Sequence, residues 1–140
     1  MTMFAKPPFV LGYAGLIPFV AATAAPWLGI ITHAFAHTIL LAYAAAILSF
    51  MAGIQWGLAM AHNQLTYARL GISVIPALIA WAALLLGGNI GLLLMAATFA
   101  GLLVYDLQLV AAGLAEDWYP KLRWPLTIIV VACLLATALT

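Results

Sequence analysis

The chain has 140 residues, of which 69% are hydrophobic and 5% are charged, and its formal net charge is +1. A soluble domain carries about a quarter of its residues as charges, so this composition excludes one and predicts that the lipid bilayer contacts most of the surface. The four basic residues are too sparse to neutralise a row of phosphates, so we expect no nucleic-acid partner. Because Cys133 is the only cysteine, the chain holds neither an internal disulfide nor a multi-thiolate metal site.

Five apolar segments are long enough to cross a membrane, since a helical span needs about 20 mostly apolar residues. Charged and turn-forming residues separate them, and the tightest predicted turn is Gly87-Gly88-Asn89, whose residues tolerate left-handed backbone. The sequence therefore predicts an all-α integral membrane protein with a single domain over residues 1–140. The expected fold is a bundle of five transmembrane helices at about 9–27, 36–61, 70–86, 90–113 and 124–139.

Three prolines bear on how these helices run. Pro18 and Pro76 lie inside the first and third spans, where each removes a backbone hydrogen bond and is expected to kink its helix. Pro125 is expected in the first turn of the last span, where its missing N–H is not needed.

The basic residues predict an orientation. Lys6 precedes the first span, Arg69 separates the second from the third, and Lys121 and Arg123 separate the fourth from the fifth. With five spans these residues share one side, and the other side has no Lys or Arg. The positive-inside rule then predicts a cytoplasmic N-terminus and an external C-terminus.

Aromatic residues near the span ends are typical of anchors at the membrane interface. These residues are Trp27, Trp56, Trp118, Tyr119 and Trp124. Trp81 lies deeper in the third span, and we expect it to pack inside the bundle.

Asp106 is the polar residue that stands out, because it lies in the fourth span about two turns, or roughly 10 Å, before the cytoplasmic end. A carboxylate at that depth needs a partner or water. Arg69 is the first choice of partner and Arg123 the second, and Gln55 and Trp56 join the cluster if they face inward. Two interpretations stay open: a pair that pins helices together, or a ligand-binding or proton-relay site.

The second span carries a small residue at every fourth position, including Ser49, Gly53 and Gly57. Such a stripe lets another helix approach closely. We expect packing within the monomer, with a homo-oligomer or a membrane-protein partner as the alternative.

His33 and His37 are four residues apart, which places both imidazoles on one helical face. No carboxylate or thiol is predicted on their side of the membrane to complete a metal shell. They are weak metal candidates, and we predict no metal and no cofactor, although a bound lipid or quinone stays open.

Several stretches resemble one family. LGYAGLIPF at 11–19, AYAAAILSFMAGIQWG at 42–57, SVIPALIAW at 73–81 and DWYPKLRWPLT at 117–127 are similar to small membrane proteins of proteobacteria and mitochondria, a family that includes transmembrane protein 69. The resemblance covers nearly the whole chain and marks Gly53, Gly57, Trp118 and Tyr119 as motif residues. It implies an inner-membrane protein of proteobacterial or mitochondrial type, here a multi-pass protein of the bacterial inner (cytoplasmic) membrane, and it brings no secure activity.

Two functions follow from these features. The first is a non-enzymatic accessory or assembly factor that acts through helix packing, near respiratory or quinone-linked machinery; the lack of recurrent enzyme motifs favours it. The alternative is a binding or transport protein for a small molecule, lipid or quinone. Its pocket would lie in the cytoplasmic half, around the cluster of Gln55, Trp56, Arg69, Asp106 and Arg123.

Overall fold

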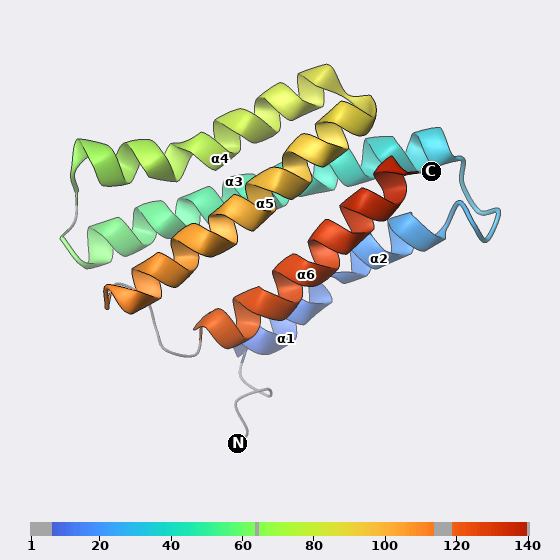
Figure 1. Ribbon diagram of the computed structural model, residues 1–140. Coiled ribbons are helices and arrows are strands. Elements are labelled where there is room, and N and C mark those ends of the chain that lie inside the picture. The colour runs from blue at the N-terminus through green and yellow to red at the C-terminus, as the bar shows by residue number, and fades with distance from the viewer. Residues whose placement is uncertain (1–6, 64, 114–118, 140) are drawn as a thin grey trace.

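The computed structural model describes residues 7–63, 65–113 and 119–139, and the ordered elements within these ranges are all helices (Figure 1). The helices lie side by side along one bundle. In chain order they are α1 (Pro7–Ala14), α2 (Ile17–Ala24), α3 (His33–Ala61), α4 (Tyr67–Leu86), α5 (Gly88–Ala111) and α6 (Tyr119–Ala138).

Four of these helices, α3 to α6, are long and apolar enough to cross a membrane. They correspond to the second to fifth predicted spans, and each begins a few residues earlier than hydropathy alone predicts. The reason is visible at two of the starts. The hydroxyls of Thr32 and Thr66 accept hydrogen bonds from the backbone N–H groups of Phe35 and Arg69, at 3.1 Å in both cases, and so cap α3 and α4.

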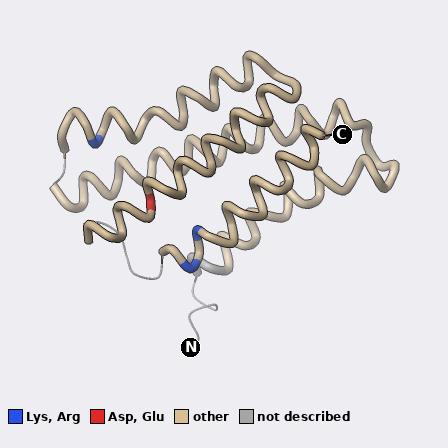
Figure 2. Tube along the Cα trace, in the orientation of Figure 1, with Lys and Arg blue, Asp and Glu red and all other residues tan. Residues whose placement is uncertain are grey.

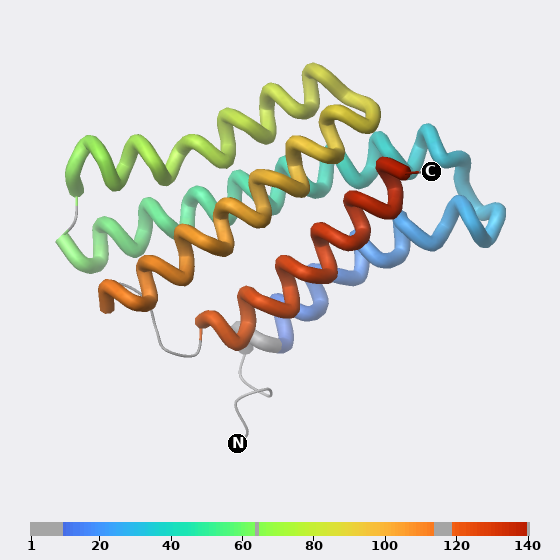
Figure 3. The backbone as a smooth tube through the Cα atoms, in the orientation of Figure 1, coloured from blue at the N-terminus to red at the C-terminus, as the bar shows by residue number. Residues whose placement is uncertain are grey.

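The first predicted span is divided into α1 and α2. Pro18 has no N–H to donate to the carbonyl of Ala14, and it lies in the first turn of α2, where none is needed. The carbonyl of Gly15, at the break, instead accepts a hydrogen bond from the Tyr43 hydroxyl of α3 at 2.9 Å. In Figure 3 the two short helices follow one another along the bundle. A fifth crossing made by α1 and α2 together stays a prediction.

The other two prolines lie inside continuous helices. Pro76 is within α4, which runs unbroken from Tyr67 to Leu86. The prediction that Pro125 occupies a first turn is wrong, because α6 has already begun at Tyr119 and Pro125 lies in its interior. There Pro125 removes the backbone bond that its N–H would donate to the carbonyl of Lys121.

Helix α3 is the centre of the bundle and contacts α2, α4, α5 and α6. Its buried side chains Leu40, Ala44 and Leu48 pack in the same core as Met95 and Phe99 of α5. Phe19 of α2 closes this core, with ring centroids 4.9 Å from Tyr43 and 6.1 Å from Phe99 in edge-on arrangements. The two short helices are therefore packed onto the bundle through aromatic contacts.

The outer surface is apolar, as expected where lipid is the solvent. Large side chains such as Leu85 and Ile90 are exposed to the surroundings at 70% and 66%. Trp81 is 62% exposed, so the prediction that it packs inside the bundle is wrong. Since lipid is as apolar as the core, nothing forces a tryptophan in mid-span to turn inward.

The turn between α4 and α5 is as tight as predicted. Gly87 and Gly88 have φ values of +63° and +58°, a backbone conformation that side chains rarely adopt. One turn into α5, the Gly91 position is buried. A Cβ built there would lie 2.7 Å from the carbonyl oxygen of Ala83 on α4 and 3.0 Å from Leu41 Cδ2 on α3. Gly91 thus allows the close approach of α4 and α5.

We predict that Gly91→Ala lowers the stability of the protein by about 1–3 kcal/mol, because the added methyl must push α4 backbone away. The matched control is Gly53→Ala on α3, where an added Cβ meets nothing within 4 Å. That change is expected to leave stability unchanged or to raise it, since alanine favours a helix. Thermal unfolding in detergent measures both, and equal midpoints for the two variants would contradict the close packing at Gly91.

Candidate functional site

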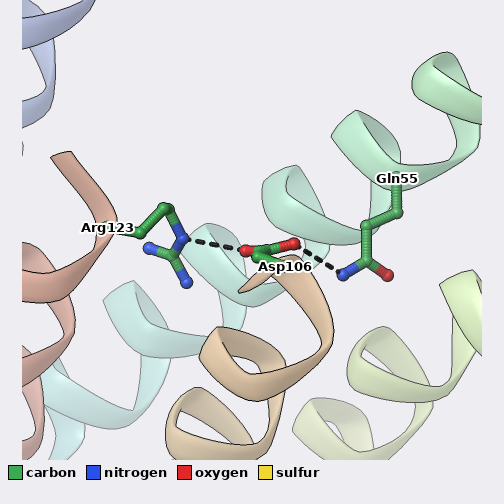
Figure 4. A network of polar contacts seen from close by, with 3 residues as sticks. All are labelled: Gln55, Asp106 and Arg123. Atoms are coloured by element: carbon green, nitrogen blue, oxygen red, sulfur yellow. Dashed lines mark hydrogen bonds and ion pairs between the residues drawn. The ribbon is translucent and has the colours of Figure 1, made fainter. Parts of the chain in front are cut away.

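A buried ion pair joins α5 to α6 in the interior of the bundle. Arg123 Nε donates to Asp106 Oδ2 at 2.9 Å, and each side chain is 2% exposed (Figure 4). Asp106 lies five residues before the end of α5, about 8 Å along the helix. The carboxylate predicted to need a partner has one, and it is the second of the two proposed.

A third helix completes the network. Gln55 of α3 is 5% exposed, and its Nε2 donates to Asp106 Oδ1 at 3.1 Å. Figure 4 shows Gln55 and Arg123 on opposite sides of the carboxylate, one for each oxygen. The charged network, defined as Gln55, Asp106 and Arg123, therefore ties α3, α5 and α6 together.

The first choice of partner for Asp106 is wrong. Arg69 Nη1 instead donates to the hydroxyl of Tyr105 at 3.2 Å. Neighbouring residues on a helix project about 100° apart. Tyr105 can therefore reach Arg69 on α4 while Asp106 faces α3 and α6. The sequence places both arginines at the same end of the bundle but does not set the rotation of α5 that decides between them.

Two buried polar atoms, one of them on Arg123 itself, have no hydrogen-bond partner among the described residues. Arg123 Nη2 and Thr127 Oγ1 are buried without a hydrogen bond, and both residues line a cavity of about 100 Å³ that α1 and α2 help to enclose through Gly12 and Phe19. A site of this size and polarity suits ordered water, which takes about 30 Å³ per molecule and bridges buried polar groups. Sequence reasoning did not find Thr127, because a lone threonine in a span carries no signal.

The described charges lie in the same part of the bundle. Figure 2 shows the blue and red positions, which mark the charged residues, in the half of the bundle away from the C-terminus. The charged residues among those described are Arg69, Asp106, Lys121 and Arg123. Trp124, next to the pair in sequence, is 49% exposed, as suits an aromatic side chain that faces lipid or the interface. Of the motif residues, Tyr119 is the first residue of α6 and is partly buried, whereas Trp118 lies outside the described residues.

The small-residue stripe of α3 faces outward. Ser49, Gly53 and Gly57 are exposed, and a Cβ built on either glycine meets nothing within 4 Å. The prediction that this stripe packs within the monomer is therefore wrong for these three residues, although Ala45, earlier in the stripe, is buried in the core. Gly91 lies at a close helix contact instead. Trp56, which was expected to join the charged network, is 41% exposed, whereas the three residues of the network are buried.

The two histidines have separate contacts. His37 Nε2 hydrogen-bonds the carbonyl of Thr137 at 3.0 Å, and since a carbonyl only accepts, Nε2 carries the proton. This bond ties the start of α3 to the end of α6. His33 meets Trp27 edge-on, with ring centroids 5.4 Å apart. Within the described ranges, no three His, Cys, Asp or Glu side chains gather in a way that suits a metal ion.

A crevice between α4 and α5 adjoins the charged network. The part nearer the charged end of the bundle, which we call the outer part, has a volume of about 600 Å³ and is lined by Arg69 and Gln108. The part farther along the two helices, which we call the inner part, has a volume of about 350 Å³ and reaches Gln55. We call the two parts together the α4–α5 crevice. Both parts are lined by Ile72, Gly101 and Tyr105.

Apolar helices around a buried charged network define a multi-pass α-helical membrane protein, in contact with the lipid bilayer. The chain belongs to the family described as "Protein of unknown function (DUF3429)", which residues 4–139 match.

Relatives in two animals carry the name that the motifs suggested. The chain is 38% identical over 142 residues to "Transmembrane protein 69" of Xenopus tropicalis, an alignment that covers 94% of this chain and 53% of the relative. It is 37% identical over 86 residues to "Transmembrane protein 69" of Mus musculus, covering 57% of this chain and 34% of the relative. The chain thus spans about half the length of the frog relative. No solved structure matches it. The resemblance proposed from the motifs is confirmed.

We predict that Asp106→Leu and Arg123→Leu each destabilise the protein by about 3–5 kcal/mol, because each leaves one buried charge unpaired. The double variant removes both charges and is expected to lose less than the sum of the two. Arg69→Leu, outside the network, serves as the control and should have a smaller effect. Reversible unfolding in mixed micelles measures all four, and additive losses in the double variant would show that the two charges are not coupled.

Proposed function

We propose that this protein is a non-enzymatic accessory or assembly factor that acts in a membrane by packing against another membrane protein. The observation that supports this proposal is the outward face of α3, defined by Ser49, Gly53 and Gly57. The helices that the structure describes leave this face uncovered, and added Cβ atoms on the two glycines meet nothing within 4 Å. Small residues at this spacing let two helix backbones approach closely enough for dispersion and Cα–H contacts to hold them.

The residues around the glycines suit a helix partner. Phe50 and Trp56, which are 64% and 41% exposed, flank the small residues on the same helix. A partner helix seated at the glycines would cover part of these aromatic surfaces as well. Aromatic side chains contribute large contact areas with little loss of conformational freedom, so they are favoured at interfaces.

The buried network supports a packing role rather than chemistry on Asp106. Both oxygens of the carboxylate accept hydrogen bonds from side chains of the chain itself, and the pair is only 2% exposed. A carboxylate held in this way fixes the relative positions of α3, α5 and α6. It thereby presents the outward face of α3 on a rigid support.

The predicted topology also bears on the orientation and location of the protein. The described basic residues lie in one half of the bundle, which supports a cytoplasmic position for that half and an external C-terminus. We propose an inner membrane as the location, with five crossings if α1 and α2 together make one. Subunits of respiratory or quinone-linked complexes are the partners that we would first look for.

We predict that replacing Gly53 and Gly57 together by leucine prevents assembly into a larger complex, because two bulky side chains keep the partner helix away. Recovery of the complex in mild detergent should fall at least about tenfold, which corresponds to a loss of roughly 1.4 kcal/mol. The fold should persist, since neither position touches another helix.

The matched control is Ala132→Leu, an exposed small residue on α6. This variant should still co-purify with the complex. If the unaltered protein is a clean monomer after crosslinking in its own membrane, or if the double leucine variant assembles as well as the control, the packing role is wrong.

A further inference from the structure

The α4–α5 crevice is a consequence of how the two helices diverge. They touch near their turn, where Gly91 lies against Ala83, and Figure 3 shows them separating toward the opposite end. Pro76 lies inside α4 and lines the inner part of the crevice, where Gly101 of α5 offers no side chain to fill it. The result is a space that begins in the charged half of the bundle and continues among apolar residues.

The outer part of the crevice suits an anion. Arg69 lines it and donates one hydrogen bond to the Tyr105 hydroxyl, but pairs with no carboxylate among the described residues. Because Tyr105 accepts that bond through its oxygen, its own O–H is left to donate. The amide of Gln108 lies on the same part of the crevice wall. These donors line one site, as recognition of a phosphate or carboxylate requires.

The inner part presents one unsatisfied acceptor. Gln55 Oε1 is buried without a hydrogen bond, and Figure 4 shows it on the side of the amide away from Asp106. The hydroxyl of Thr98 in the same wall cannot serve it, since it donates to the carbonyl of Leu94 at 2.7 Å, and the Tyr105 hydroxyl makes no hydrogen bond to it. A ligand that satisfies Gln55 must therefore bring a donor. A quinone offers only acceptors, so it cannot satisfy this oxygen.

Beyond Gln55 the crevice is apolar. Its inner wall carries Ile75, Ile79 and Leu94 together with Pro76. Space of about 350 Å³ lies within the range of about 300–1,000 Å³ that small-molecule sites have. From the outer part to the inner part, the crevice wall therefore presents the donors of Arg69 and Tyr105 first, then the acceptor of Gln55, and then apolar side chains.

We propose that the α4–α5 crevice binds a single-chain anionic amphiphile, with its anionic head at Arg69 and Tyr105. A hydroxyl or amide N–H just inside the head donates to Gln55 Oε1, and the hydrocarbon chain lies against Pro76. Monoacyl glycerophosphates have this order of groups, as do N-acyl amino acids. This site goes beyond the packing role proposed above and does not depend on it.

Binding to the full chain is measured by native mass spectrometry from a neutral detergent. The probes are oleoyl glycerophosphate, the analogue that lacks its glycerol hydroxyl, oleoyl glycerophosphocholine and inorganic phosphate. An N-oleoyl amino acid distinguishes a carboxylate head from a phosphate head. We expect one equivalent of oleoyl glycerophosphate to bind about tenfold more tightly than either the hydroxyl-free analogue or the phosphocholine lipid.

Two variants locate the site. Arg69→Gln should remove the preference for the anionic lipid over the phosphocholine lipid, whereas Arg69→Lys should retain most of it. Gly101→Leu fills the crevice and should abolish binding, because its side chain points into space where an added Cβ meets nothing within 4 Å. Ala100→Leu is the control on the same helix, at an exposed position outside the crevice lining. Thermal unfolding shows that each variant is folded.

The outcomes decide between this site and its alternatives. An unchanged anion preference in Arg69→Gln, or unchanged binding in Gly101→Leu, would place the lipid elsewhere and overturn the proposal. Inorganic phosphate that displaces the lipid at equal concentration would show an anion site with no role for the chain, and would overturn it too. Equal binding of the hydroxyl-free analogue would remove the assigned role of Gln55.

Discussion

A single buried charge pair constrains the rest of this molecule. Asp106 and Arg123 are both 2% exposed, in a bundle whose surroundings are lipid. Neither charge is exposed to bulk solvent, so helices α5 and α6 must stay in the register that keeps Nε and Oδ2 2.9 Å apart. Gln55 extends the constraint to α3, and the short helices α1 and α2 cover the outer side of the arginine.

This network explains why the two sides of α3 differ. The inner side supplies Leu40, Ala44, Leu48 and Gln55 to the core, so its positions are fixed by packing and by the charged network. The outer side carries Gly53 and Gly57, which touch no other helix among the described residues. A rigid inner side with an uncovered outer side is what a helix needs in order to present a small-residue surface to a partner.

Much of the fold could be predicted from the sequence, because the bilayer makes length and apolarity decisive. Helices α3 to α6 and the turn at Gly87 and Gly88 follow from these rules alone. Asp106 and Gln55 were identifiable because polar side chains in a span are expensive and few. The division of the first span at Gly15 was harder to predict, since Pro18 predicts a kink but not how far the helix is interrupted.

The rotation of each helix about its axis was what the sequence could not supply. In water an apolar stripe shows which side of a helix faces the core, but in lipid both sides are apolar and the stripe loses its meaning. This is why Arg69 was chosen over Arg123, and why Trp81 and the stripe of Ser49, Gly53 and Gly57 were placed inward. The contacts of α4 and α5 show that Gly91, rather than Gly53 or Gly57, lies at a close helix contact.

The measurement that tests the outward face of α3 most directly is thiol crosslinking in the native membrane. Cys133 is first replaced by serine, and a single cysteine is then introduced as Ser49→Cys or, on α6, as Ala132→Cys. We predict a defined crosslinked species of higher mass from the cysteine at position 49 and none from that at position 132. No product from position 49, or equal products from both positions, would contradict the claim that this face of α3 is an interface.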